Sequence, residues 1–251
     1  MADFTDSEIE RYARHIVMPE IGGAGQQKLK AAQVAVVGVG GLGCPLSLYL
    51  VAAGIGTLTV VDDDFVALSN LQRQVMFTAD DDGVSKTKIA ESRLAALNPD
   101  VSIRSRETRL NHENVDELLV GSSVVVDGSD NAQTRQIVAD WCMVSRIPLV
   151  TGSLYRFDGN VTVIAPWLGP DGRPGSSPQY DELFSTNEDD GAVPDCAEAG
   201  ILGPIAGVIG TMQAVEVIKM ITGIGKPLIG RIIHFDALNS QFETFITASR
   251  T

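Results

Sequence analysis

The stretch VAVVGVGGLGCPLSLYLVAAGIGTLTVV, residues 34–61, decides the fold of this 251-residue chain. It carries no charge over 28 positions, and an apolar stretch of that length can span a bilayer. Its glycines cluster at 38–43 and 54–56, however, where a chain alternating between strand and helix has to turn. We therefore interpret it as a strand at 34–37, a helix to about residue 53 and a strand at 57–61, buried inside a sheet rather than in a membrane.

The same alternation of strands and helices continues to about residue 151. Ser85 and Asn111 are expected to cap the helices that follow them. The remaining expected helices and strands of this part are helices at 6–17, 22–31, 85–97, 111–120 and from 132 to about 146, and strands at 101–105, 123–126 and 148–151. This order predicts an α/β fold, Rossmann-like and doubly wound, with a mostly parallel sheet.

The pattern changes in the last third of the chain. LYRFDGNVTVIAP, residues 154–166, is interpreted as a hairpin that turns at Asp158-Gly159. Residues 166–200 are rich in Pro, Gly, Ser and acids, which is typical of a functional or mobile connection. An apolar helix is expected at 203–222, followed by two strands in 229–247. These strands should extend the sheet in antiparallel fashion, and no clean domain boundary divides residues 1–251.

The excess of acidic residues argues against some classes of function. Nineteen basic against 32 acidic residues give a net charge of −13, which argues against a nucleic-acid binder or a protein of anionic membranes. Three cysteines, Cys44, Cys142 and Cys196, are too few and too scattered for a disulfide framework. The acidic N-terminus has no apolar core of the kind that a secretory signal needs. We expect a reducing, cytoplasmic location.

A glycine motif indicates a nucleotide site. Gly38, Gly40 and Gly43 form G-x-G-x-x-G between a strand and a helix, where backbone amides face an anion. Asp62 follows Gly43 by 19 residues, at the end of the next strand, where a carboxylate accepts ribose hydroxyls. The alternative is a glycine-rich turn that serves packing alone. On these residues by themselves, NAD is the default ligand.

The residues downstream suit a more highly charged nucleotide. LSNLQRQ, residues 68–74, holds Asn70, Arg73 and Gln74, and Lys86 begins a helix. Arg73 offers phosphate a fork of donors and Lys86 a point charge. The alternative is that both are ordinary surface cations. A lysine in a first helical turn opposes the helix dipole unless an anion lies nearby, which favours the phosphate site for Lys86.

A third element is DGSDN, residues 127–131, directly after an apolar strand. Asp127 and Asp130 are therefore expected at the carboxyl edge of the sheet, where ligands bind in such folds. Asp130 suits a magnesium ion that bridges phosphates. It suits the N-cap of the next helix equally well, and spacing alone leaves the two open.

Several segments together resemble a known family. They are RYARHIVMPEIGGAGQQKL (11–29), VVGVGGLGCPLSLYLVAAGIG (36–56), VDDDFVALSNLQRQ (61–74), SKTK (85–88), LNP (97–99), VVDGSDN (125–131) and CAEAGILGPIAGVIGTMQAVEVIK (196–219). From about residue 8 to residue 238 the chain is similar to the ubiquitin-activating-type adenylyltransferases of sulfur-carrier biosynthesis, the HesA/MoeB/ThiF proteins. The resemblance implies a homodimer that uses Mg-ATP to adenylate the C-terminal glycine of a small ubiquitin-like carrier protein ending in Gly-Gly.

The resemblance also assigns roles to residues. It implies a nucleotide-binding half at 1–150 and a carrier-binding and dimer half at 151–251. The implied site residues are Gly41, Asp62 and Asn131 for the nucleotide, Asn70, Arg73 and Lys86 for phosphate, Asp130 for magnesium, and Arg14, contributed by the neighbouring subunit. Cys196 matches a cysteine that bonds to the carrier in some relatives and is dispensable in others, so a covalent role and an inert loop thiol both stay open.

The chain departs from the family at its zinc ligands. Many members hold a structural zinc with two Cys-x-x-Cys pairs; one pair falls at Gln179 and Glu182 here, and the other in a tail beyond Thr251. We expect no zinc, and a segment at 166–200 that is more mobile than in zinc-bearing relatives. A carrier of the molybdopterin-synthase type is favoured. A thiamine-type or other sulfur carrier, an inert carrier-binding scaffold and, remotely, an NAD-dependent oxidoreductase are the alternatives.

Overall fold

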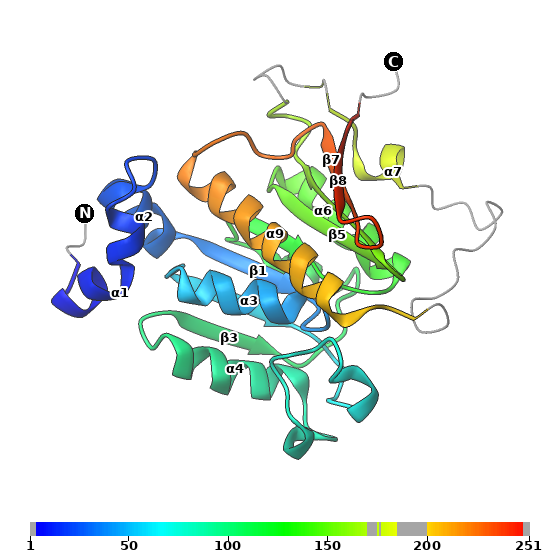
Figure 1. Cartoon of the computed structure of the whole chain (residues 1–251), viewed down its shortest axis with the longest axis horizontal. Helices are drawn as coiled ribbons and strands as arrows, with labels where there is room; N and C mark the ends of the chain where they lie inside the picture. Colours follow the sequence, from blue (N-terminus) through cyan, green and yellow to red (C-terminus); the bar gives the residue numbers. More distant parts are fainter. Residues whose placement is uncertain (1–3, 170–174, 176, 185–199, 248–251) are drawn as a thin grey trace.

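An eight-stranded sheet organises the molecule in the computed structural model, which describes residues 4–169, 175, 177–184 and 200–247. The strand order is β3-β2-β1-β4-β5-β6-β7-β8 (Figure 1). The strands are β1 Gln33–Val37, β2 Thr57–Val61, β3 Ser102–Arg106, β4 Val124–Asp127, β5 Leu149–Tyr155, β6 Asp158–Ile164, β7 Arg231–Asp236 and β8 Gln241–Ile246. The first five run parallel and the last three antiparallel. This confirms the expected fold class.

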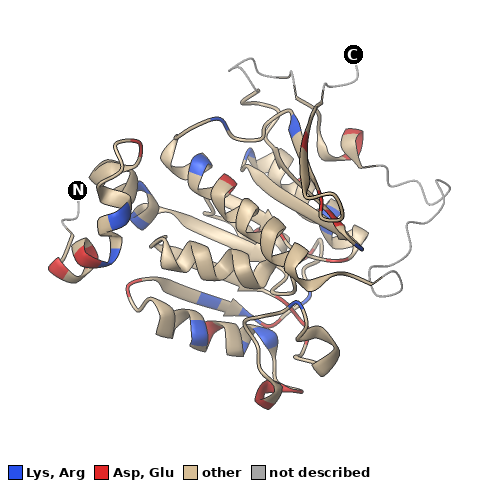
Figure 2. Cartoon of the chain, in the orientation of Figure 1, with Lys and Arg blue, Asp and Glu red and all other residues tan. Residues whose placement is uncertain are grey.

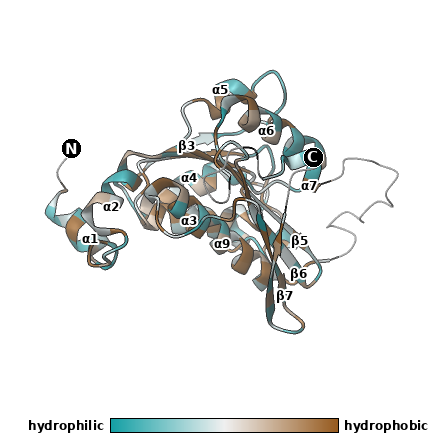
Figure 3. Cartoon of the chain, turned by 90° about the horizontal axis from the view of Figure 1, so that it is seen from above, coloured by the Kyte–Doolittle hydropathy of each residue, from teal (hydrophilic) through white to brown (hydrophobic). Residues whose placement is uncertain are grey.

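Helices cover both faces of the sheet. The helices are α1 Asp6–Ile16, α2 Gly22–Ala31, α3 Gly43–Ala52, α4 Lys86–Leu97, α5 Val115–Leu119, α6 Ala132–Ser145, α7 Tyr180–Leu183 and α9 Gly203–Thr222, with short 3-10 turns η1 Leu68–Asn70 and η2 Ala79–Asp81. Figure 3 shows α5 and α6 on one side of the sheet and α3 and α9 on the other. Two separate buried clusters result, because alternate residues of β1 face opposite layers: Val34 and Val36 one, Ala35 and Val37 the other.

The uncharged stretch at 34–61 forms β1, α3 and β2 within these layers, as expected. Both strands are almost fully buried by neighbouring strands and helices. Helix α9 is long and apolar enough to cross a membrane by length and composition. Half of its apolar window is buried in the fold, however, so packing in the core accounts for its composition. Figure 2 shows no charge on α3 and only Glu216 and Lys219 on α9.

The hairpin turn was predicted in the wrong place. Tyr155 pairs with Asp158, so the chain turns at Arg156-Phe157, and Arg156 has a φ of 52°. Gly159 lies inside β6 instead, because a Cβ at this position would collide with the Ile209 side chain of α9. Asp-Gly is a common turn dipeptide, but here the glycine allows helix α9 to approach the strand.

One side-chain cap and one helix start differ from the sequence-based prediction. Ser85 occupies the N-cap position of α4, but its hydroxyl pairs with the Thr87 hydroxyl at 3.1 Å and caps nothing. Asn111 accepts from the amides of Glu113 and Asn114 at 2.8 and 3.2 Å, forming a turn, and α5 begins only at Val115. Asn side chains often close such local turns in place of a helix cap.

Candidate active site

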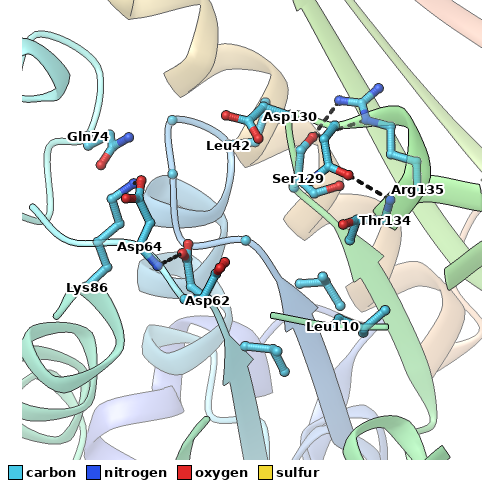
Figure 4. A pocket seen from close by; sticks show the side chains of 18 of the residues that line it. Leu42, Asp62, Asp64, Gln74, Lys86, Leu110, Ser129, Asp130, Thr134 and Arg135 are labelled. Atoms are coloured by element: carbon cyan, nitrogen blue, oxygen red, sulfur yellow. Dashed lines mark hydrogen bonds and ion pairs between the residues drawn. The ribbon is translucent and has the colours of Figure 1, made fainter. Parts of the chain in front are cut away.

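A cavity of about 470 Å³ opens at the carboxyl ends of β1, β2 and β4, the edge where open α/β sheets bind ligands. Its size suits a nucleotide-sized ligand. The residues lining it are Val37, Gly38, Gly40, Gly41, Leu42, Val61, Asp62, Asp63, Asp64, Arg73, Gln74, Lys86, Thr108, Arg109, Leu110, Gly128, Ser129, Asp130, Asn131, Thr134, Arg135, Leu154 and Ile201. Figure 4 shows several of these side chains around the cavity.

The glycine motif forms the turn between β1 and α3. Gly38 has a φ of +91°, and a Cβ there would lie 2.8 Å from the carbonyl carbon of Gly128. A Cβ at Gly43 would collide with the Gly38 carbonyl oxygen. The amides of Gly40, Gly41 and Leu42 have no acceptor among the residues that the structure describes. Free amides at a helix N-terminus are what an anion requires.

Asp62 lies beside this turn, at the end of β2. Its carboxylate accepts from the amide of Val39 at 2.7 Å and from that of Asp64 at 2.9 Å. Burial raises the pKa of Asp62, against the opposing effects of the Lys86 charge and the two amides. Each carboxylate oxygen retains a lone pair for a further donor, so Asp62 can still accept from a ribose hydroxyl.

Lys86 is a buried cation with a partner that the sequence did not indicate. It is 4% exposed, and its Nζ lies 2.5 Å from Asp64 Oδ2. Burial raises the pKa of Asp64, but the hydrogen bond from Lys86 and the amide of Phe65 outweigh it and hold that pKa below its usual value. Asp64 thus balances Lys86 in the first turn of α4.

Arg73 and Gln74 lie over the glycine turn. Arg73 lines the cavity, and its Nη2 donates to Asn70 Oδ1 at 3.1 Å. Asn70 itself is not among the lining residues, so it supports Arg73 instead of facing the cavity directly. Gln74 is 4% exposed, and its Oε1 has no partner within the described part of the chain. Gln74 was seen in the sequence but given no role.

The structure of the turn at 127–131 bears on the two roles considered for Asp130, magnesium ligand and N-cap of the next helix. Asn131 is the N-cap of α6, with Oδ1 accepting from the amide of Thr134 at 2.8 Å. Asp127 is fully buried and accepts from the Ser129 hydroxyl at 2.6 Å. Asp130 is exposed in the cavity and has neither a hydrogen bond nor an ion pair to any residue that the structure describes. An unpaired carboxylate among phosphate-binding groups suits a hard cation such as Mg²⁺.

Three expectations concern residues away from this cavity. Arg14 is exposed on α1 and does not line the cavity of its own chain. Cys196 and most of the crossover at 166–200 lie outside the described residues. Gln179 is the N-cap of α7 and Glu182 lies in that helix, and the Gln179 amide donates to Glu182 Oε2 at 2.8 Å. Among residues 4–169, 175, 177–184 and 200–247, no group of three or more His, Cys, Asp or Glu side chains is placed to hold a metal.

Known proteins are similar to this chain in sequence over most of its length. The SAMP-activating enzyme E1 of Haloferax volcanii is 45% identical, over 95% of this chain and 85% of its own length. The sulfur carrier protein adenylyltransferase of Thermus thermophilus is also 45% identical, over 95% and 87%. The sulfur carrier protein ThiS adenylyltransferase of Escherichia coli is 39% identical, over 95% and 91%.

Solved structures share the fold at lower identity. The crystal structure of PaaA superposes with a TM-score of 0.81 at 24% identity, covering 99% of this chain and 76% of that one. Escherichia coli MccB, crystallised with ATP, gives a TM-score of 0.81 at 23% identity, covering 98% and 73%. The model of the ThiF family matches residues 12–251. With relatives this similar over most of their length, the chain belongs to the ThiF family, and its Thermus thermophilus and Escherichia coli relatives are named as sulfur carrier protein adenylyltransferases.

Proposed function

We propose that this chain binds Mg-ATP in the cavity and adenylates the C-terminal glycine of a small ubiquitin-like sulfur-carrier protein ending in Gly-Gly. The observation that carries the proposal is the meeting of Asp62, Arg73, Lys86 and the unpaired Asp130 around one glycine turn. Gly41 belongs to that turn, where a Cβ would lie 3.4 Å from the Arg73 side chain. The names of the relatives support the reaction and its carrier substrate.

The reaction needs little proton chemistry from the protein. The carrier's terminal carboxylate is already ionised at neutral pH, so it attacks the α-phosphorus without a general base and pyrophosphate leaves. Catalysis then depends on positioning and on neutralising phosphate charge. Arg73 and Lys86 supply cations, and ATP phosphates compete with Asp64 for Lys86. A magnesium ion held by Asp130 would add positive charge at the phosphates, as carboxylates commonly hold it.

The second half of the chain is proposed to bind the carrier and a second copy of the chain. Helix α9 of this half exposes Val215 at 51%, and it packs on α3 of the first half, which exposes Tyr49 at 59%. Such exposed apolar side chains are expected where subunits meet. In the homodimer, Arg14 of one protomer would reach the phosphates of its partner, which gives an exposed arginine on α1 a role in catalysis.

Mixed dimers test the role of Arg14. Arg14→Ala and Asp130→Ala homodimers should each be inactive, because every site lacks one group. A heterodimer of the two variants has one site with both groups if Arg14 acts across the interface, and it should recover about half of the wild-type activity, as expected for one intact site of two. An inactive heterodimer would contradict action across the interface, and full activity of the Arg14→Ala homodimer would remove Arg14 from the site.

Magnesium-dependent ATP–pyrophosphate exchange tests the function and identifies the carrier. Each purified carrier ending in Gly-Gly is supplied separately, and Asp130→Ala serves as the blank. We expect exchange that depends on one carrier, with the molybdopterin-synthase type favoured over a thiamine-type or other carrier. Exchange with a carrier that lacks its last glycine would contradict the proposed substrate atom.

Two other functions predict different results. An inert scaffold would bind a carrier without exchange, and an NAD-dependent oxidoreductase would bind NAD and leave ATP unbound. The site residues Arg73, Lys86 and Asp130 count against both alternatives. Neither a scaffold nor an NAD-binding enzyme requires two cations and a magnesium ligand at the phosphates. Cys196 is tested by Cys196→Ser: a covalent role requires loss of carrier thiolation with exchange intact. A cytoplasmic location fits the free thiols Cys44 and Cys142.

A further inference from the structure

Asp130 is held through the residue before it. The Arg135 guanidinium donates twice to the Ser129 carbonyl, from Nε at 3.1 Å and from Nη2 at 2.6 Å. That carbonyl belongs to the peptide group whose nitrogen is the amide of Asp130. Two donors on one oxygen resist rotation of this peptide, and with it a change in the direction of the Asp130 side chain (Figure 4).

Asp127 holds the opposite side of Ser129. Its Oδ1 accepts from the Ser129 amide at 3.0 Å and from the hydroxyl at 2.6 Å, while Oδ2 accepts from the Thr151 hydroxyl at 3.0 Å. Asp127 Oδ2 also lies 3.6 Å from Arg135 Nε. The amide, hydroxyl and carbonyl of Ser129 are therefore all engaged by one ion pair, in which Asp127 is fully buried and Arg135 is partly buried. Burying such a pair adds little net stability, so its benefit has to come from the geometry that it imposes.

The same arginine lies beside the crossover segment, because α7 packs on α6. Burial raises the pKa of the Tyr180 phenol, and the charge of Arg135 opposes that rise. Tyr180 is 8% exposed. A change in the position of α7 would therefore reach Ser129 through a single side chain.

We propose that Arg135 is a positioning residue for the reaction: it fixes the Ser129–Asp130 peptide so that the Asp130 carboxylate faces the phosphates and their metal, and Tyr180 on the crossover holds Arg135 in that position. The inference rests on the proposed function, because it assumes that Asp130 acts on Mg-ATP. It adds a path by which a carrier seated against α7 alters the phosphate site.

The test measures binding by calorimetry, without turnover. Dissociation constants are determined for Mg-ATP and, in the absence of magnesium, for AMP. The variants are Asp130→Ala, Arg135→Lys, their combination and Tyr180→Phe. Arg135→Lys keeps the charge beside Asp127 but loses the paired donors, and Tyr180→Phe removes one hydroxyl. Arg146→Lys, exposed at the end of the same helix, is the matched control.

We expect Arg135→Lys to weaken Mg-ATP binding about tenfold, the usual effect of removing a partner that orients a metal ligand. Tyr180→Phe should weaken it less, and AMP binding should stay unchanged in both. Because Arg135 acts only through Asp130, the double variant should bind Mg-ATP no more weakly than Asp130→Ala. Arg146→Lys should bind both ligands as the wild type does.

Three results would overturn the inference: unchanged Mg-ATP binding in Arg135→Lys, an equal loss of AMP binding, or losses that add fully in the double variant. The first, with Asp130→Ala still weakened, removes the positioning role and leaves the proposed function intact. Unchanged Mg-ATP binding in Asp130→Ala itself would instead refute the magnesium site, and the role of Arg135 with it.

Discussion

Two turns at the same edge of the sheet are built in opposite ways. The turn after β1 is held by backbone contacts too close to admit a side chain, at Gly38 and Gly43. The turn after the neighbouring strand β4 is held by side chains, with Asp127 and Arg135 gripping Ser129. The shape of the first turn requires that Gly38 and Gly43 carry no side chain. The shape of the second depends on hydrogen bonds from residues of β5, α6 and α9.

The difference separates a rigid part of the site from an adjustable one. Backbone packed against backbone has no rotamers to change, so the amides of the glycine turn are fixed before any ligand arrives. The aspartate turn is held by Arg135 of α6, and α7 with its buried Tyr180 packs on that helix. A change in the position of α7 can therefore alter the shape of this turn.

Gly43→Ala should break the rigid turn and produce the largest effect. The added Cβ collides with the carbonyl oxygen of Gly38, which is backbone and cannot yield. We expect a loss of about 4 kcal/mol in the free energy of unfolding and no detectable nucleotide binding. Chemical denaturation and calorimetry measure the two effects.

Gly40→Ala is the matched control, since its Cβ would meet only the Gln74 side chain, at 3.6 Å. It should unfold within about 1 kcal/mol of the wild type. Equal behaviour of the two variants would contradict the account of the glycine turn.

Asp127→Asn should loosen the adjustable turn with a smaller loss. The amide cannot accept every hydrogen bond that the carboxylate accepts, and Arg135 loses its counter-charge. Removing one partner of a buried pair costs about 3 kcal/mol, and denaturant unfolding measures it. Asp140→Asn, exposed on α6, should unfold as the wild type does. Full stability together with unchanged Mg-ATP affinity in Asp127→Asn would show that the hydrogen bonds of Asp127 do not hold the aspartate turn in its shape.

The smallest effect concerns pH and Asp62, which bridges β2 and the glycine turn. An ordinary aspartate has a pKa of about 3.9. Burial raises the pKa of Asp62, so its carboxylate becomes protonated at a higher pH. AMP affinity should therefore fall as the pH drops through this raised value, because a protonated oxygen accepts less well from ribose. The sign for folding is opposite: the neutral form is favoured by burial, so the stability it contributes is lost as the pH rises through the folded-state pKa.

Calorimetric titrations with AMP between about pH 4 and pH 7, spanning the range of perturbed carboxyls, measure this dependence. Asp62→Asn should bind AMP more weakly and without the acid limb. The same acid limb in that variant would assign the titration to another group.

The sequence predicted the rigid turn better than the adjustable one, for a physical reason. Gly38, Gly40, Gly43 and Asp62 act through local spacing, which a sequence displays directly. The grip on Ser129 joins Asp127 to Thr151 and Arg135, and Gln213 of α9 donates to the Asp127 carbonyl at 2.9 Å. Such partners meet only in the folded chain, so spacing left Asp130 undecided between cap and metal ligand.

The misplaced hairpin follows the same rule. Gly159 is a glycine because a side chain there would collide with Ile209 of α9. That helix residue lies 50 positions later in the sequence (209 − 159), so the local Asp-Gly pair indicated only a turn. Asp64 as the partner of Lys86 was missed although it lies in the same segment as Asp62. Which charged residues pair across a cavity depends on how the folded chain brings them together. The sequence shows that Asp64 and Lys86 are charged, but not that they are neighbours.

Intact-mass spectrometry of the carrier tests the central claim most directly. The chain is incubated with Mg-ATP and the carrier that supports exchange, and the reaction is stopped in acid. The account predicts a carrier heavier by one AMP, formed with an equal amount of pyrophosphate, absent with Asp130→Ala and absent when the carrier lacks its last glycine. An unchanged carrier mass while ATP is bound or consumed would contradict it.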